Sequence, residues 1–228
     1  MCARCAERPR SIRDKTMPKA AIISLKVAAF LAALVPFGLL VYGGFTNNLG
    51  PDPIATLTHT TGDWTIRFLL ITLAIAPLRR LSVHLNWLVR FRRMMGLYAF
   101  FYGSLHLLTY VWLYSQFDVQ RMIADILKRK FITVGMLGWL LMLPLALTST
   151  AWAIRKMGGK RWQALHRLVY FAAIAGVIHY WWLVKNGVYT PLTYTVILAA
   201  LLLARILWKF SRPRKQPVQA GAPSVAKA

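Results

Sequence analysis

The segment from Trp162 to Trp182, WQALHRLVYFAAIAGVIHYWW, is a long apolar run with one histidine near each end. At about 1.5 Å rise per residue, a helix of this length can cross the hydrocarbon core of a bilayer. His166 and His179 would then lie roughly 20 Å apart along the helix axis, on opposite sides of the midplane. Ionisable side chains are costly at such depths, so both are candidate functional residues.

Further apolar stretches alternate with short polar connections along the rest of the chain. Hydrophobic residues make up 57% of the sequence, and 29 Lys and Arg stand against 6 Asp and Glu. In a soluble chain a net charge of +23 would suggest nucleic-acid binding. Here the cations fall between the apolar runs, which predicts a lipid bilayer as partner and no nucleic acid. The predicted fold is all-α, a polytopic bundle of six transmembrane helices at residues 21–45, 64–78, 94–116, 131–154, 162–182 and 191–208.

The predicted membrane domain, residues 21–208, lies between basic tails at residues 1–20 and 209–228. Six spans place both tails on one side of the membrane. That side carries 22 Lys and Arg against 5 in the opposite loops, which predicts that both termini are cytoplasmic. The first tail lacks the apolar core of a signal peptide. Its Cys2 and Cys5 have no second cysteine pair nearby, so we expect a disordered tail rather than a metal or redox site.

The connections between the spans are short. Residues 47–63 are predicted to form a polar outer loop, and residues 117–130 a short amphipathic helix on the membrane surface. Arg67, near the start of the second span, is expected at the membrane interface. Because the chain has no Gly-rich nucleotide fingerprint, any nicotinamide chemistry would have to come from a partner.

His106 lies near the middle of the third span. Both the third and the fifth span enter from the cytoplasm, so His106 and His179 lie toward the outer face and differ in depth by only about 6 Å. Helix tilt can absorb such a mismatch. This depth match predicts that the two histidines form a pair.

The neighbours of both histidines are small. Gly103 and Ala99 precede His106 by three and seven residues, and Gly176 and Ala172 precede His179 in the same way, so each histidine shares a helix face with small residues. Such a surface leaves room for a flat macrocycle. Alternatively, it only lets helices approach closely. We interpret the pair as axial ligands of a haem, because two imidazoles suit electron transfer.

His166 is a different case. Thirteen residues at about 100° each place it roughly 140° around a straight helix from His179. The third span offers no histidine at the inner depth, where Arg92 and Arg93 stand instead. One hypothesis is a second, inner haem with His166 as ligand and Arg92 or Arg93 binding its propionates. The other is a flavin or quinone pocket in which His166 is a hydrogen-bond partner.

The remaining histidines carry weaker signals. His59, in the outer loop, could contact a partner or cap a helix. His84 stands among arginines on the cytoplasmic surface, where solvent or lipid headgroups surround it. Two rival functions also fit intramembrane histidines: a proton-coupled transporter, and a non-catalytic anchor in which they merely bond neighbouring helices.

Five motifs of the chain agree in order and spacing with a known family: HTTG at 59–62, FLLITLAIAPLRR at 68–80, RRMMGLYAFFYGSLHLLTY at 92–110, LTSTAWAIRKMGGKRWQALHRLVY at 147–170 and IHYWWLVK at 178–185. The chain resembles the MsrQ family, formerly YedZ, within the ferric-reductase-like transmembrane superfamily. His106, His166 and His179 match the family pattern residue by residue.

The resemblance implies one or two b-type haems, associated FMN, and a multi-pass position in the bacterial inner membrane. It implies that electrons come from the quinone pool or a flavin reductase. They would pass to MsrP, a periplasmic molybdopterin enzyme that reduces methionine sulfoxide in envelope proteins. This chain would then be the electron-transfer subunit, with catalysis in the partner. It departs from ferric reductases and NADPH oxidases because it has no flavin and nicotinamide domain and no fourth histidine to complete two bis-histidine sites.

Overall fold

The computed structural model describes residues 18–184 and 189–211, and within these ranges it contains helices and turns but no strand. Most of each predicted tail lies outside the described residues, and so do Cys2 and Cys5. The elements in chain order are α1 (Lys19–Phe45), α2 (Pro53–Leu81), the 3-10 helix η1 (Val83–Leu88), α3 (Val89–Thr109), the π-helical turn η2 (Tyr110–Tyr114), α4 (Val119–Lys128), α5 (Lys130–Leu147), α6 (Ala151–Met157), α7 (Gly159–Leu165), α8 (Leu168–Leu183) and α9 (Tyr189–Phe210).

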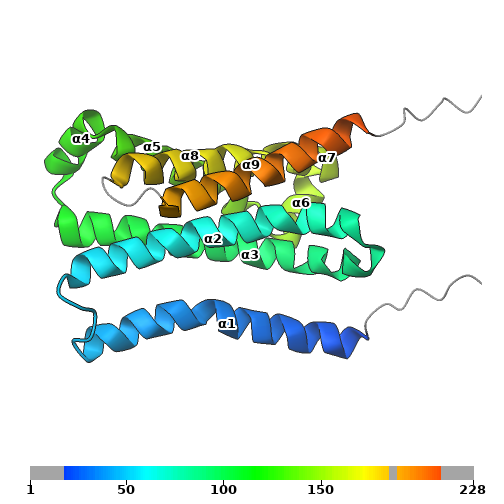
Figure 1. The fold of residues 1–228 in the computed structure, drawn as a ribbon, viewed down its shortest axis with the longest axis horizontal. Helices are drawn as coiled ribbons and strands as arrows, with labels where there is room; N and C mark the ends of the chain where they lie inside the picture. The colour runs from blue at the N-terminus through cyan, green and yellow to red at the C-terminus, as the bar shows by residue number, and fades with distance from the viewer. Residues whose placement is uncertain (1–17, 185–188, 212–228) are drawn as a thin grey trace, which may run out of the picture.

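The long helices form a bundle whose members run side by side (Figure 1). Helix α2 packs mainly against α3, and α5 packs mainly against α8, while α9 contacts both α2 and α8. Helix α1 lies along the outside of α2 and α3. The first turn of α1 and the last turn of α9 lie at the same end of the bundle, and α4 lies at the opposite end (Figure 1).

Four described helices are long and apolar enough to cross a membrane: α1, α2, α5 and α9. Helix α8, with 16 residues, is shorter than the about 17–25 that a span usually needs. Helix α3 begins with the arginine-rich VRFRR and is not among the four either. The membrane class predicted from the sequence is therefore supported, whereas the count of six spans and the cytoplasmic termini stay predictions.

The predicted outer loop at residues 47–63 is wrong over most of its length, because α2 already begins at Pro53. The Asp52 side chain caps this helix by accepting a hydrogen bond from the Ala55 amide at 3.0 Å, and proline suits the first helical position. His59 is therefore an interior helical residue and not a cap. Arg67 stands at the middle of α2 rather than near its start, and its Nε donates to the Tyr194 hydroxyl at 3.0 Å.

The predicted helices at residues 131–154 and 162–182 are each interrupted. Helix α5 ends at Leu147, and a turn at His166 and Arg167 separates α7 from α8. At the end of α5, a side chain supplies the hydrogen bond that a continuing helix would give to a backbone carbonyl. The Trp162 indole donates to the Thr148 carbonyl at 2.9 Å. The break at His166 replaces the straight helix that the sequence analysis assumed between His166 and His179.

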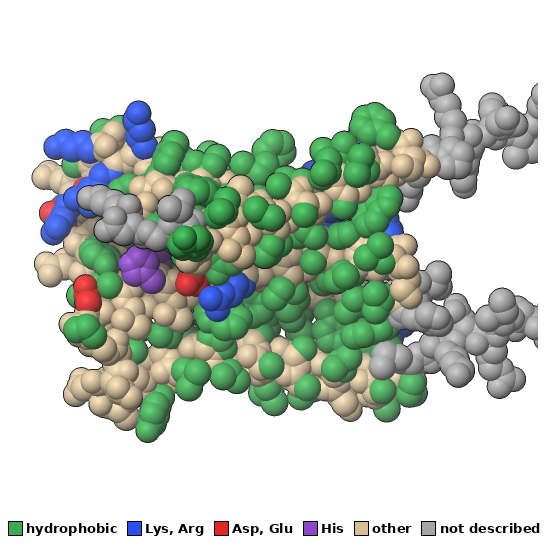
Figure 2. All heavy atoms as spheres, in the orientation of Figure 1, with side chains coloured by type: hydrophobic (Ala, Val, Ile, Leu, Met, Phe, Trp, Pro, Cys, Tyr) green, Lys and Arg blue, Asp and Glu red, His purple; other side chains and the backbone are tan. Residues whose placement is uncertain are grey.

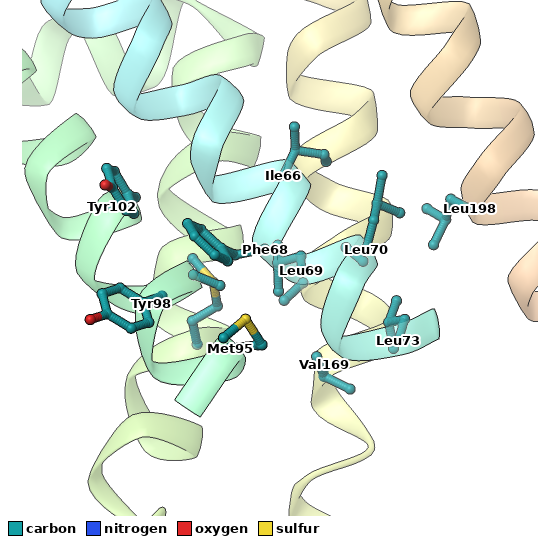
Figure 3. Close-up of a cluster of buried hydrophobic side chains, with 14 of the residues drawn as sticks. Ile66, Phe68, Leu69, Leu70, Leu73, Met95, Tyr98, Tyr102, Val169 and Leu198 are labelled. Atoms are coloured by element: carbon teal, nitrogen blue, oxygen red, sulfur yellow. The ribbon is translucent and has the colours of Figure 1, made fainter. Parts of the chain in front are cut away.

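The core lies between α2, α3, α8 and α9 (Figure 3), where α2 contributes an almost continuous apolar run. The labelled core residues are Ile66, Phe68, Leu69, Leu70, Leu73, Met95, Tyr98, Tyr102, Val169 and Leu198. Small residues hold α5 close to α8, where Gly138 faces Ala175. The long sides of the bundle expose many large hydrophobic side chains (Figure 2), as expected for a lipid-facing surface.

Candidate haem site

The bundle brings His106 of α3 and His179 of α8 together at the end that carries α4. Their ring centres lie 5.9 Å apart, with the ring planes at 83° to one another. A metal ion bound to two imidazole nitrogens at about 2 Å each holds the two ring centres roughly 6 Å apart. The depth match inferred from the sequence thus corresponds to a spacing that suits an ion bound between the rings.

Each ring is oriented in the same way by a backbone carbonyl. His106 Nδ1 lies 2.9 Å from the Thr58 carbonyl oxygen, and His179 Nδ1 lies 2.6 Å from the Phe131 carbonyl oxygen. A carbonyl oxygen only accepts hydrogen bonds, so Nδ1 carries the proton in both rings. In the neutral imidazole Nε2 then holds the free lone pair, which is the form that a metal ion binds.

Two glycines that face the rings were not singled out from the sequence. A Cβ atom on Gly62 of α2 would lie 3.1 Å from His106 Nδ1, and one on Gly135 of α5 would lie 2.7 Å from His179 Nδ1. The sequence did carry a partial signal, since Gly62 belongs to the HTTG motif. The carbonyls of Thr58 and Phe131 could not be found in this way, because every residue has one.

The two histidines line a cavity of about 380 Å³ between α2, α3, α5 and α8. This volume is within the about 300–1,000 Å³ typical of small-molecule sites. Of the small neighbours predicted from the sequence, Gly103, Ala172 and Gly176 line the cavity, whereas Ala99 is buried in the core. Much of the lining is apolar, and it also includes the His59 imidazole and four charged side chains: Asp63, Arg121, Asp125 and Arg129.

His106, His179 and the cavity fit a haem. The paired rings, their carbonyl-bound Nδ1 atoms and the adjacent glycines fit a haem that His106 and His179 would hold through Nε2. Within residues 18–184 and 189–211, no group of three or more His, Cys, Asp or Glu side chains is close enough to hold a metal ion.

His166 lies apart from this pair, in a smaller cavity of about 60 Å³. Its Nε2 lies 3.2 Å from the Thr148 hydroxyl, which donates its own proton to the Pro144 carbonyl. The hydroxyl must therefore accept from His166, so that Nε2 carries the proton. This tautomer is the reverse of that of His106 and His179. The ring also stacks on Trp162, with 3.8 Å between ring centres.

Arg92 and Arg93 line the same small cavity as His166, so the structure does bring these three predicted residues together. Arg93 donates a hydrogen bond to the Ser149 carbonyl. They lie at the start of α3 and not beside the paired histidines. His59 lines the larger cavity, and for His84 the structure describes only its backbone position in η1.

A family model described as "Ferric reductase like transmembrane component" matches residues 61–177, about half of the chain. This range runs from α2 into α8, and it includes His106 and His166. The chain belongs to this family of ferric-reductase-like transmembrane proteins.

Curated relatives indicate which group within this family the chain is similar to. A protein from Herminiimonas arsenicoxydans is 49% identical over 199 residues, covering 86% of this chain and 91% of the relative. A relative from Ralstonia nicotianae is 44% identical, and the match covers 90% of this chain and 95% of the relative. A relative from Bordetella pertussis is 47% identical, and the match covers 82% of this chain and 90% of the relative. All three are named protein-methionine-sulfoxide reductase heme-binding subunit MsrQ. The resemblance to the MsrQ family that the sequence motifs indicated is confirmed.

Proposed function

We propose that this chain is a membrane electron-transfer subunit that holds one b-type haem between His106 and His179. The observation that carries the proposal is the pair of facing rings, 5.9 Å apart, each with Nδ1 bound to a carbonyl and Nε2 left for a ligand. The names of the relatives, heme-binding subunits of a methionine sulfoxide reductase, support the same cofactor.

Bound haem would supply one-electron redox chemistry. The residues of this chain would hold, orient and shield it. His106 and His179 would hold it through their Nε2 atoms. The Thr58 and Phe131 carbonyls fix the two rings. The apolar lining, which includes Ile66, excludes water from the inner part of the cavity.

The electron acceptor in this proposal is a periplasmic MsrP-like molybdoenzyme that repairs oxidised methionines, and the donor is the quinone pool or a flavin reductase. The chain would lie in the bacterial inner membrane with α3 and α8 as the two further spans. Residues 21–208 would form the membrane domain between two cytoplasmic tails. The larger number of Lys and Arg in the segments predicted to be cytoplasmic supports this orientation, in which the cavity faces the periplasm.

We propose a hydrogen-bonding role for His166 rather than a second haem. Its cavity of about 60 Å³ is far smaller than the roughly 300 Å³ at which small-molecule sites begin. Its Nε2 already donates to Thr148. For the same reason of space, we assign no residues of this small cavity to FMN.

The test is a reduced-minus-oxidised absorption spectrum of the purified full-length protein, with haem extracted and counted per chain. We expect a b-type spectrum and one haem. Electron delivery is then tested by mixing the reduced protein with a purified MsrP-like enzyme and methionine sulfoxide, and following reoxidation. Two haems per chain would restore His166 as an iron ligand. A folded but colourless protein would overturn the proposal and favour the proton-coupled transporter.

A further inference from the structure

Helix α4 carries two stripes of four-residue spacing. Val119, Ile123 and Leu127 form an apolar stripe with exposed fractions of 60%, 54% and 78%. Arg121 and Asp125, continued by Arg129 just past the helix end, form a charged stripe that lines the cavity of the paired histidines. Residues four apart share a helix face, so the apolar stripe faces outward and the charged stripe faces the cavity.

This orientation is the reverse of the usual one. An amphipathic helix that packs on a protein turns its apolar stripe toward the core and its charged stripe toward water. The outward apolar stripe agrees with the membrane-surface position predicted for residues 117–130. Figure 2 shows Lys and Arg side chains gathered over this end of the bundle. Arg121 and Arg129 are exposed although they line the cavity, so their guanidinium groups are available to an anionic group at its mouth.

The charges on the α4 side of the cavity mouth do not balance among themselves: Arg121 and Arg129 stand there with the single carboxylate of Asp125. Asp125 is already paired, because Arg129 Nε lies 3.2 Å from its Oδ1 and the Tyr110 hydroxyl donates to its Oδ2 at 3.3 Å. The other carboxylate that lines the cavity, Asp63, belongs to α2 and not to the α4 side. Over the described ranges, the Arg121 guanidinium has no acidic side chain within salt-bridge distance. The α4 side of the mouth therefore has one cation in excess.

We propose that Arg121, assisted by Arg129, binds the propionate groups of the haem held by His106 and His179. This inference rests on the proposed function. Haem has two carboxylates at one edge, and the arginine fork matches a carboxylate with two parallel charge-assisted hydrogen bonds. The propionate partners thus come from α4, and not from Arg92 and Arg93, which line the other cavity.

The test compares variants of the full-length protein in nanodiscs by the rate at which haem transfers to excess apomyoglobin. Arg121→Gln should speed haem loss by about ten-fold, the effect of losing a charge-assisted hydrogen bond. Arg121→Lys should recover part of the loss because it keeps the charge. Lys128→Gln is the matched control, since Lys128 is an exposed cation of α4 that does not line the cavity. It should leave the rate unchanged.

A second arm uses haem dimethyl ester, in which both propionates are blocked. With this ligand, the wild type and Arg121→Gln should lose the macrocycle at equal rates. A ten-fold difference that persists with the ester would overturn the proposal. So would unchanged haem loss together with weaker binding to vesicles containing phosphatidylglycerol, because Arg121 would then bind lipid phosphate. Failure of the proposed function looks different, since the wild type itself would then carry no haem.

Discussion

At the scale of single residues, three histidines differ in which ring nitrogen, Nδ1 or Nε2, makes a hydrogen bond. In His106 and His179 a carbonyl accepts from Nδ1, whereas in His166 the Thr148 hydroxyl accepts from Nε2. The same residue type thus has Nδ1 bonded and Nε2 in the lone-pair form at two positions, and donates a hydrogen bond from Nε2 at the third.

The histidine pair makes a spectroscopic prediction. His106→Ala and His179→Ala should each abolish the b-type absorption, because either change removes one of two axial ligands. His166→Ala should retain the haem signal, since its ring lies in another cavity. Circular dichroism and gel filtration check that the variants are folded. Loss of the signal in His106→Ala but not in His179→Ala would show that the two do not share an iron.

Gly135 makes a steric prediction. Its Cβ would lie 2.7 Å from His179 Nδ1, so Gly135→Ala should displace the ring from the Phe131 carbonyl. Losing such an orienting contact typically lowers metal affinity by about 10- to 100-fold, and we expect a haem loss of that order, measured as haem per chain after dilution. Gly38→Ala is the control, because no atom lies within 4 Å of its added methyl group. Equal haem content in both variants would contradict the packing described for His179.

At the scale of elements, α1 is attached to the bundle by tyrosine hydroxyls of α3. The Tyr102 hydroxyl donates to the Ala33 carbonyl at 2.7 Å and accepts from the Phe37 amide at 3.1 Å. It therefore stands between two backbone groups that would otherwise bond each other within the helix. Pro36, which has no amide proton, already weakens the ladder at this point.

Tyr102→Phe should weaken this attachment. It leaves the bridged carbonyl and amide of α1 without their buried partner, which costs about 1–3 kcal/mol. Thermal unfolding in detergent should show a lower midpoint. Tyr98→Phe, which removes a single hydrogen bond to the Phe30 carbonyl, should have a smaller effect. An effect of Tyr98→Phe equal to or larger than that of Tyr102→Phe would contradict the bridging role.

At the scale of the whole molecule, the two ends of the bundle differ in what they carry. One end holds α4 and the mouth of the larger cavity, and the other holds the first turn of α1, the last turn of α9 and the arginine-rich start of α3. In the proposed function, this polarity would set the side from which a redox partner approaches the histidine pair.

The orientation can be tested with single cysteines in a Cys2→Ser, Cys5→Ser background. Gln120→Cys on α4 should react with a membrane-impermeant maleimide in intact spheroplasts. Lys160→Cys on α7 should react only after the membrane is permeabilised. Both positions are exposed, so accessibility within the protein does not limit labelling. The reverse pattern would place the cavity on the cytoplasmic side and rule out a periplasmic partner docking there.

Much of the site could be predicted because ionisable residues inside apolar runs, which cost free energy in a membrane, are visible in a sequence. Histidines within apolar runs are rare enough to indicate function, and helix geometry sufficed to pair His106 with His179 by depth. The helix boundaries were less predictable. The polar residues before Trp64 suggested a loop, yet they continue α2 because Asp52 and Pro53 start a helix there. The break at His166 depends on Thr148, which lies 18 residues earlier in the chain.

The sequence by itself determined the membrane class, the helical fold and the family, because apolar length, charge distribution and motif order are local properties of the chain. Only the tertiary structure decided which nitrogen of each histidine is free, which glycines adjoin the rings, and that α4 turns its arginines toward the cavity. These features depend on contacts between helices distant in sequence. The Thr58 and Phe131 carbonyls that orient the two rings each lie 48 residues from the histidine they bind.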